Sequence, residues 1–190
     1  WPEVEKLMAH LLNLVPQNDE ARRMIIQAQL KQGHFAQAAQ SANQLTDPIQ
    51  QQSMLQELRI KWITQNPPPA AQVKDWLAGT VNVEDREQLW RAYATVLSKQ
   101  PDGEQKALAW LNSVRGEQDV EALRRERAVW AEKLNDWRTV VAELSPMAAS
   151  GKLSTANWER LATAYAALQD EAGLKALLPL APGQDAIVQA

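Results

Sequence analysis

Apolar residues recur along this chain at a spacing of about 34 residues, and this recurrence limits the folds that the chain can adopt. One set of positions at this spacing holds only apolar residues: Met8, Ala42, Trp76, Trp110, Leu144 and Leu178. A second set is aliphatic and mostly small: Ile26, Ile60, Ala94, Ala128 and Ala162. A third set is again apolar: Ala28, Trp62, Val96, Trp130 and Ala164. Unrelated amphipathic helices would drift out of phase after two or three elements, so the recurrence indicates one structural unit that is repeated along the chain.

Residues 28–38 indicate what the repeated unit is. A helix-forming segment rich in small residues stops at Gly33, the aromatic Phe35 follows two residues later, and Ala38 lies in the next helix-forming segment. Glycine adopts the left-handed backbone of a tight turn at no steric cost. The pattern predicts a hairpin of two helices that approach closely at Ala38. With its period, this hinge resembles the tetratricopeptide repeat (TPR).

The resemblance implies an all-α fold, an α-solenoid in which antiparallel helix hairpins stack into a right-handed superhelix. It implies one domain over residues 1–182, with about five TPR-like repeats after an N-terminal half repeat. The half repeat covers 1–16, and the repeats cover 19–48, 49–79, 84–115, 119–150 and 154–182. Residues 183–190 lack a periodic pattern, and we expect them to fray. In the second full repeat Pro67, Pro68 and Pro69 replace the glycine turn, and we interpret them as a rigid hairpin loop.

Apolar spacing predicts eleven helices, over 2–15, 19–32, 35–46, 49–65, 70–78, 84–99, 104–114, 119–134, 137–149, 154–168 and 171–180. Asp19 and Ser154 are expected as N-caps, because their side-chain oxygens can accept hydrogen bonds from backbone N–H groups. Asn135 is expected as a left-handed cap. Arg124 and Arg127 stand where the family prefers large apolar residues, so the helix over 119–134 departs from the pattern.

The chain holds eight tryptophans and one phenylalanine. Six of the tryptophans fall at positions that we expect to face other helices: Trp62, Trp76, Trp90, Trp110, Trp130 and Trp158. We interpret them as core residues that fill the space between hairpins. The alternative is that they form aromatic platforms for a sugar or a peptide.

Composition argues against several classes of protein. The chain has no cysteine, so it holds neither disulfides nor thiolate metal sites. Its net charge of -3 argues against a nucleic-acid surface, and no apolar run of about 18 residues predicts a membrane span. Its two histidines, His10 and His34, lie in no metal-ligand pattern, and no nucleophile elbow or glycine-rich phosphate loop is present. We therefore predict a protein that is not an enzyme and that takes no cofactor and no metal.

Two functional interpretations follow from the resemblance. The first is a non-catalytic scaffold for protein–protein interaction that binds a peptide or protein segment in its concave groove. The alternative is a structural superhelical segment of a larger bacterial envelope enzyme or of a glycan-export or secretion machine, which rests on family analogy. That analogy favours the bacterial periplasm or envelope, and the cytoplasm is also compatible with the sequence. TPR domains that hold acidic chaperone tails use a lysine–asparagine set, whereas the matching places here include Arg23, Gln27, Met54 and Leu58, so no such tail is expected to bind tightly.

The family's geometry places the groove on first-helix residues that point away from the partner helix. One column of such positions, spaced by about 34 residues, is Arg23, Glu57, Arg91, Arg125 and Glu159. A second is Gln27, Lys61, Thr95, Val129 and Thr163, and a third is Lys31, Gln65, Lys99, Lys133 and Ala167. Basic residues outnumber acidic ones in these columns although the whole chain is acidic. The predicted partner is therefore an acidic or carboxylate-bearing segment. The predicted contacts are Arg23, Gln27, Lys31, Lys61, Arg91, Thr95, Lys99, Arg125 and Lys133; the alternative is an ordinary solvated face.

The predicted helix over 2–15 has no upstream partner helix in the repeat. Its apolar stripe includes Val4, Leu7 and Leu11. Terminal repeats of solenoids normally need a polar outer face, so this stripe predicts self-association through the N-terminal edge. The chain begins at Trp1 without a methionine, and we interpret it as an excised or processed piece.

Overall fold

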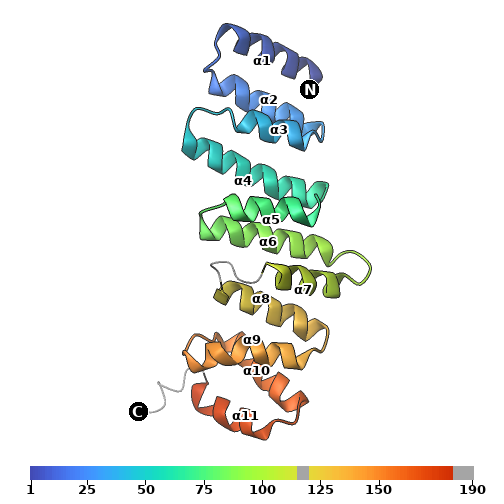
Figure 1. The fold of residues 1–190 in the computed structure, drawn as a ribbon, viewed down its shortest axis with the longest axis vertical. Coiled ribbons are helices and arrows are strands. Elements are labelled where there is room, and N and C mark those ends of the chain that lie inside the picture. Colours follow the sequence, from blue (N-terminus) through green and yellow to red (C-terminus); the bar gives the residue numbers. More distant parts are fainter. Residues whose placement is uncertain (115–119, 182–190) are drawn as a thin grey trace. The chain divides into compact units, whose positions relative to one another are not determined.

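The computed structural model describes residues 1–114 and 120–181. Every regular element in these ranges is a helix and no strand is present, which confirms the all-α fold. The chain divides into two compact units, Trp1–Pro69 (unit 1) and Ala70–Ala190 (unit 2), shown in Figure 1. The boundary follows Pro69, the last residue of the three-proline turn. One continuous superhelix over residues 1–182 stays a prediction, and the expected fraying of 183–190 concerns residues outside the described ranges.

Unit 1 consists of four helices that pack in sequence order. They are α1 (Pro2–Leu14), α2 (Asp19–Lys31), α3 (Phe35–Ala42) and α4 (Pro48–Gln65). Helix α1 packs against α2, α2 against α3, and α3 against α4. The core of the unit is formed by buried side chains of α2, α3, α4 and the α3–α4 connection: Ile26, Ala38, Ala42, Leu45, Leu55 and Leu58. Helices α2, α3 and α4 therefore bury their apolar side chains in one shared core.

The hinge between α2 and α3 has the geometry that its sequence predicts. Gly33 has a φ of 76°, in the left-handed region that favours glycine. Ala38 is completely buried, so the two helices approach closely there. Phe35 is 4% exposed and stacks on Trp62 of α4, with ring centroids 5.7 Å apart. The hinge thus anchors the next helix of the unit through an aromatic pair.

The prediction that Asp19 caps α2 is wrong. Asn18 is the N-cap, and its side-chain oxygen accepts a hydrogen bond from the backbone N–H of Ala21 at 2.9 Å. Asp19 instead accepts hydrogen bonds from the backbone N–H of Thr46, at 3.0 Å, and from the Thr46 hydroxyl, at 2.5 Å. Helix α3 ends at Ala42 and not at residue 46 as its apolar spacing suggests, because the backbone N–H groups of Gln44 and Leu45 bond to oxygens three residues back and not four.

Unit 2 contains seven α-helices and one short 3-10 helix among its described residues. They are α5 (Ala70–Gly79), α6 (Val83–Leu97), α7 (Gly103–Ser113), α8 (Val120–Lys133), α9 (Trp137–Ala149), α10 (Thr155–Ala167), α11 (Glu171–Leu177) and η1 (Leu178–Leu180). Each α-helix packs against its neighbour in sequence, as Figure 1 shows for α5 to α11. In addition, α6 contacts α8, and α8 contacts α10. The first helices of three successive hairpins, α6–α7, α8–α9 and α10–α11, therefore lie next to one another.

Helix ends agree with the sequence prediction to within about two residues, except in α3 and α11. Ser154 caps α10 as predicted, and Asn135 has the predicted left-handed backbone with a φ of 55°. Helix α11 ends at Leu177, and the chain enters η1 with Pro179 inside it. Because proline lacks a backbone N–H, it cannot continue the hydrogen bonding of the helix.

The tryptophans are mainly packing residues. Trp90, Trp110 and Trp130 are 4%, 4% and 6% exposed, which confirms their place in the core, whereas Trp62, Trp76 and Trp158 are half-buried. The indole N–H of Trp110 donates to the backbone oxygen of Trp90 at 3.0 Å, and that of Trp158 donates to the backbone oxygen of Leu177 at 3.2 Å. These large side chains thus fill space between helices while their polar atoms stay satisfied.

A buried ion pair explains how α8 tolerates arginine at a core position. Arg127 Nη2 lies 2.6 Å from Glu143 Oε1 on α9, and the two side chains are only 5% and 3% exposed. Arg124, the other arginine that stands where the family prefers a large apolar residue, is half-buried. A buried charge is tolerated when a partner of opposite charge compensates its lost hydration. The Glu143 carboxylate of α9 therefore balances the arginine that α8 carries at a buried position.

Replacing Glu143 by leucine should destabilise the protein strongly, because it leaves the Arg127 guanidinium in the core without this counterion. We expect a loss of about 3–5 kcal/mol in the free energy of unfolding, and recovery of most of it when Arg127→Met is added. Urea unfolding followed by tryptophan fluorescence measures both. The control is Glu159→Leu, at an exposed position of α10, which should change stability by at most about 0.5 kcal/mol. Equal stabilities of Glu143→Leu and Glu159→Leu would contradict the prediction.

The contact between Asp19 and Thr46 should lower the pKa of the Asp19 carboxyl, and this can be measured. The hydrogen bond from the Thr46 hydroxyl is the main cause that lowers the pKa of the Asp19 carboxyl, with help from backbone N–H groups. Because the folded pKa is depressed, this carboxylate stabilises the fold at neutral pH, and the contribution is lost as the pH falls through the folded pKa. Thr46→Val should raise the pKa of Asp19 towards the ordinary value for aspartate, as followed by NMR titration. Thr64→Val, which removes a hydroxyl bonded only to backbone oxygens of α4, should leave it unchanged.

Candidate functional site

Five of the predicted contact residues lie on the exposed faces of two neighbouring first helices in unit 2. Arg91 and Thr95 are exposed on α6, and Lys99 is exposed just after its end. Arg125 and Lys133 are exposed on α8. Residues separated by four positions share one face of a helix, and α6 contacts α8 directly. These side chains therefore belong to one surface, here called the first-helix face of unit 2.

Arg91 is held by acidic side chains of the same face. Its Nη2 atom lies 2.6 Å from Glu87 Oε1, and its Nε donates to Glu126 Oε2 on α8 at 3.2 Å. The other carboxylate oxygen of Glu126 accepts the indole N–H of Trp130 at 3.1 Å. The guanidinium carbon also lies 5.3 Å from the ring centroid of Trp90. Arg91 therefore braces α6 against α8, and its charge is largely compensated.

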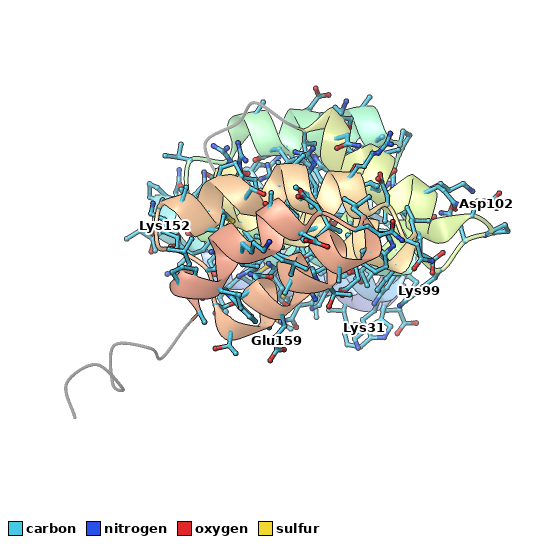
Figure 2. The ribbon with its side chains drawn as sticks, turned by 90° about the horizontal axis from the view of Figure 1, so that it is seen from below. Lys31, Lys99, Asp102, Lys152 and Glu159 are labelled. Carbon is cyan, nitrogen blue, oxygen red and sulfur yellow. The ribbon has the colours of Figure 1, made fainter. Side chains whose placement is uncertain are left out.

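A second bridge joins α8 to α10. Arg160 Nε donates to Glu132 Oε2 at 2.6 Å, and Arg160 Nη1 donates to Asn157 Oδ1 at 2.7 Å. On the same helix Glu159 is exposed, and Figure 2 shows it projecting from the surface. The columns drawn from the sequence omit Glu87, Glu126, Glu132 and Arg160. The sequence does contain a signal for these bridges: in each one, an acidic residue and an arginine stand about 28 or 35 positions apart. Residues at such separations fall on adjacent first helices.

The remaining basic residues of this face stand apart from the two bridges. The Lys133 ammonium lies 3.9 Å from the centroid of the Trp130 ring, a cation–π contact. Lys99 and Asp102 project from one end of the unit 2 helices in Figure 2, and Lys152 projects from the other end. Lys152 pairs with Glu121 and is the main cause that lowers the pKa of that carboxyl; Arg125 adds a smaller electrostatic effect. The basic character of the face thus rests on Lys99, Arg125 and Lys133.

Unit 1 presents the other predicted contacts. Arg23 is half-buried; it pairs with Glu20 at 2.5 Å and donates to Gln50 Oε1 of α4 at 2.5 Å. Lys61 pairs with Glu57 at 2.5 Å on the same helix. The other two contacts in this unit, Gln27 and Lys31, are exposed on α2. Arg23 therefore links α2 to α4 in the way that Arg91 links α6 to α8.

The predicted N-terminal edge is partly open to solvent. Leu7 is 63% exposed, while Val4 and Leu11 are half-buried. On another side of α1, Glu5 accepts hydrogen bonds from the side chains of Gln29 and Gln32, at 2.9 and 3.0 Å, and so fastens α1 to α2. Self-association through Val4, Leu7 and Leu11 stays a prediction.

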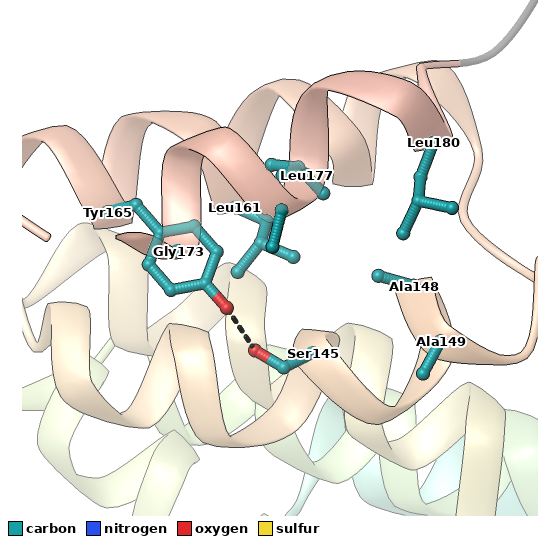
Figure 3. A pocket seen from close by; sticks show the side chains of 9 residues that line it. Ser145, Ala148, Ala149, Leu161, Tyr165, Gly173, Leu177 and Leu180 are labelled. Carbon is teal, nitrogen blue, oxygen red and sulfur yellow. Dashed lines mark hydrogen bonds between the residues drawn. The ribbon is translucent and has the colours of Figure 1, made fainter. Parts of the chain in front are cut away.

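Unit 2 also has an apolar hollow, the C-terminal pocket, between α9, α10, α11 and η1 (Figure 3). Its volume is about 170 Å³, and its apolar walls are formed by Ala148, Ala149, Leu161, Ala176, Leu177 and Leu180. Ser145 Oγ and the Tyr165 hydroxyl oxygen, 2.8 Å apart, form a hydrogen bond on one wall. Tyr165 can lie there because Gly173 has no side chain: a Cβ at Gly173 would lie 2.4 Å from ring carbons of Tyr165. The residues present suit an aliphatic group beside a hydrogen-bonding one.

A second hollow of about 330 Å³ lies in unit 1 at the turn between α2 and α3. It is lined by the hinge residues and by the end of α4: Gly33, His34, Phe35, Ala36, Gln37, Trp62 and Asn66. Its lining mixes an aromatic pair with amide side chains, and it is wide open. The described residues contain no group of three or more His, Cys, Asp or Glu that could hold a metal ion.

No protein-family model, curated protein or solved structure matches the chain. Among the helices of residues 1–114 and 120–181, none combines the length and the apolar character that a membrane span requires. The geometry of the two units is therefore the basis for any functional conclusion.

Replacing Gly173 by alanine should disturb the C-terminal pocket. The added methyl group would collide with the Tyr165 ring, so the ring must move and its hydrogen bond to Ser145 should be lost. Such overpacking typically costs about 1–3 kcal/mol, which urea unfolding measures. Gly79→Ala is the matched control, because a Cβ there meets no atom within 4 Å. If both alanine variants were as stable as the original protein, the close approach of Gly173 and Tyr165 would have no energetic role.

Proposed function

We propose that this chain is a tetratricopeptide-like, non-catalytic scaffold that binds a protein or peptide segment on the exposed face of its first helices. One observation carries the proposal: in unit 2, α8 contacts both α6 and α10, and the Arg91–Glu126 and Glu132–Arg160 ion pairs join it to them. Side chains of three helices, distant in sequence, are thereby presented on one continuous surface. Such a surface is what repeat solenoids use to bind extended partners.

The order of contacts within each unit supports the solenoid part of the proposal. In both units each helix packs on its sequence neighbour, and bridges run between successive first helices. In a solenoid each hairpin buries its apolar face against the adjacent hairpin, so contacts stay local. The packing in unit 1 and in unit 2 has this character. We extend it to the family assignment: a superhelix of TPR-like hairpins whose concave side takes the partner.

The charges of the first-helix face favour an acidic partner segment. Arg91 is committed to Glu87 and Glu126, so it acts as a brace rather than as a ligand contact. Lys99, Arg125 and Lys133 are exposed and take no part in the two inter-helix bridges. Lysines near the ends of α6 and α8 also complement the helix dipoles, which accounts for part of their placement. The proposed contacts are therefore Lys99, Arg125 and Lys133, with Thr95 between them.

The test uses two fluorescent peptides, one rich in glutamate and its twin with glutamine at the same positions. The glutamate peptide should bind more tightly, and its binding should weaken as salt rises, because exposed charges are screened over about 10 Å at 0.1 M salt. The double change Lys99→Glu and Lys133→Glu should weaken its binding by at least about tenfold, or roughly 1.4 kcal/mol. Fluorescence anisotropy measures the dissociation constants.

A matched control separates the face from the net charge. Lys106→Glu with Lys175→Glu makes the same change of charge on exposed positions of the second helices α7 and α11. This control should bind the glutamate peptide nearly as well as the original protein. Equal losses in both double variants, or equal binding of the two peptides, would rule out a specific acidic site on the first-helix face.

A further inference from the structure

Charge is distributed unevenly along the two central helices of the first-helix face. Lys133 is the last residue of α8, and Lys99 follows the end of α6. Glu126 and Arg91, which pair with each other, stand seven and eight residues before these lysines. In a helix that separation is roughly 10–12 Å along the axis. Salt at 0.1 M screens exposed charges over about 10 Å, so a carboxylate bound at either lysine is largely shielded from Glu126.

Glu126 is fixed in its place beside Arg91. One of its carboxylate oxygens accepts a hydrogen bond from Arg91 Nε at 3.2 Å, and the other accepts the Trp130 indole N–H at 3.1 Å. Trp130 is itself held in the core, with 6% of its surface exposed. The side chain of Glu126 is only 18% exposed. Glu126 therefore stays where it is when a partner approaches the face.

Arg91 has the chemistry to bind a carboxylate, but its surroundings oppose one. Its side chain is 48% exposed, and a guanidinium carries five N–H donors. Its contacts with Glu126 and Glu87 engage Nε and Nη2. Two carboxylates thus face one guanidinium, and a third would be repelled by like charges at short range. Arg91 can accept a neutral oxygen of a partner more readily than a charged one.

We propose that Glu126 is a specificity-determining residue of the first-helix face, which keeps a partner's carboxylates away from Arg91. This role rests on the proposed function, the binding of an acidic segment. Interfaces gain specificity from repulsion as well as from attraction. The partner segment then presents its carboxylates to Lys99 and Lys133, and an uncharged side chain or a backbone oxygen to Arg91. Glu126 thereby determines where along the face acidic residues can bind.

The variant Glu126→Gln tests this role with the glutamate peptide. Glutamine loses the charge but keeps an oxygen that can accept the Trp130 N–H. Arg91 is then available to a carboxylate, so the variant should bind the glutamate peptide about three- to fivefold more tightly than the original protein does. A merely structural role for Glu126 predicts no such gain. Fluorescence anisotropy measures the dissociation constants, and slow solvent exchange of the Trp130 indole proton in NMR shows that the local fold is kept.

Two further comparisons show whether the gain comes from Arg91. The double variant Glu126→Gln with Arg91→Gln should bind no more tightly than Arg91→Gln alone, because the gain requires the guanidinium. The matched control is Glu159→Gln, which removes the same charge from an exposed position of α10 on the same face. It should tighten binding by less than about twofold, as expected for a distant, screened charge. Adding Arg91→Gln should leave that small effect in place.

The role of Glu126 is overturned if Glu126→Gln binds the glutamate peptide no more tightly than the original protein. It is also overturned if the gain survives Arg91→Gln. The glutamine peptide separates this failure from failure of the proposed function. Equal binding of the two peptides to the original protein would rule out the acidic site, and with it the role of Glu126. A preference for the glutamate peptide, without a gain that depends on Arg91, would overturn the role of Glu126 alone.

Discussion

The close approach of helices at fully buried alanines is the contact on which this structure depends. Ala28, Ala38 and Ala42 in unit 1, and Ala94 and Ala128 in unit 2, are completely buried. A methyl group keeps the axes of packed helices near one another, whereas a larger side chain in a well-packed core forces its neighbours to shift. These alanines therefore help to fix which side of α2, α3, α6 and α8 faces inwards. The opposite side is fixed at the same time, and it carries Arg91, Arg125 and the other exposed charges.

Ion pairs between neighbouring first helices add to this apolar packing. Within unit 2, neighbouring first helices are joined by ion pairs whose partners come from different hairpins, α6 to α8 and α8 to α10. Partly exposed ion pairs of this kind contribute little stability individually. Their more evident effect is on charge: they remove Arg91 and Arg160 from the positive charge that the face can offer. What remains is a small group of side chains at Lys99, Arg125 and Lys133.

Much of the fold can be predicted from the sequence, because period, glycine and capping residues act locally. Gly33, Asn135 and Ser154 have the predicted backbone or capping roles, and most helix ends lie close to their expected places. The cap by Asn18 is a local feature, because asparagine and aspartate are both suitable N-caps and stand side by side in the sequence. The actual role of Asp19 could not be predicted, since it depends on a contact with Thr46, 27 residues along the chain. The brace at Arg91 was missed for the same reason, as its partner Glu126 lies on another helix. The periodicity predicts that the first-helix residues spaced by about 34 positions are exposed. Their net charge depends on the residues that lie next to them in space, which the periodicity does not show.

The buried pair of Arg127 and Glu143 makes the hairpin α8–α9 non-interchangeable with the others. Repeats of one design can be duplicated, deleted or recombined in evolution, because each offers a similar surface to the next. An α8 joined to a second helix without a carboxylate at the place of Glu143 would bury its guanidinium without this counterion, at a cost that a small unit could not tolerate. The two residues must therefore be inherited together. Within unit 2, this ion pair thus matches α8 to α9 by charge, which the spacing of apolar residues alone does not do.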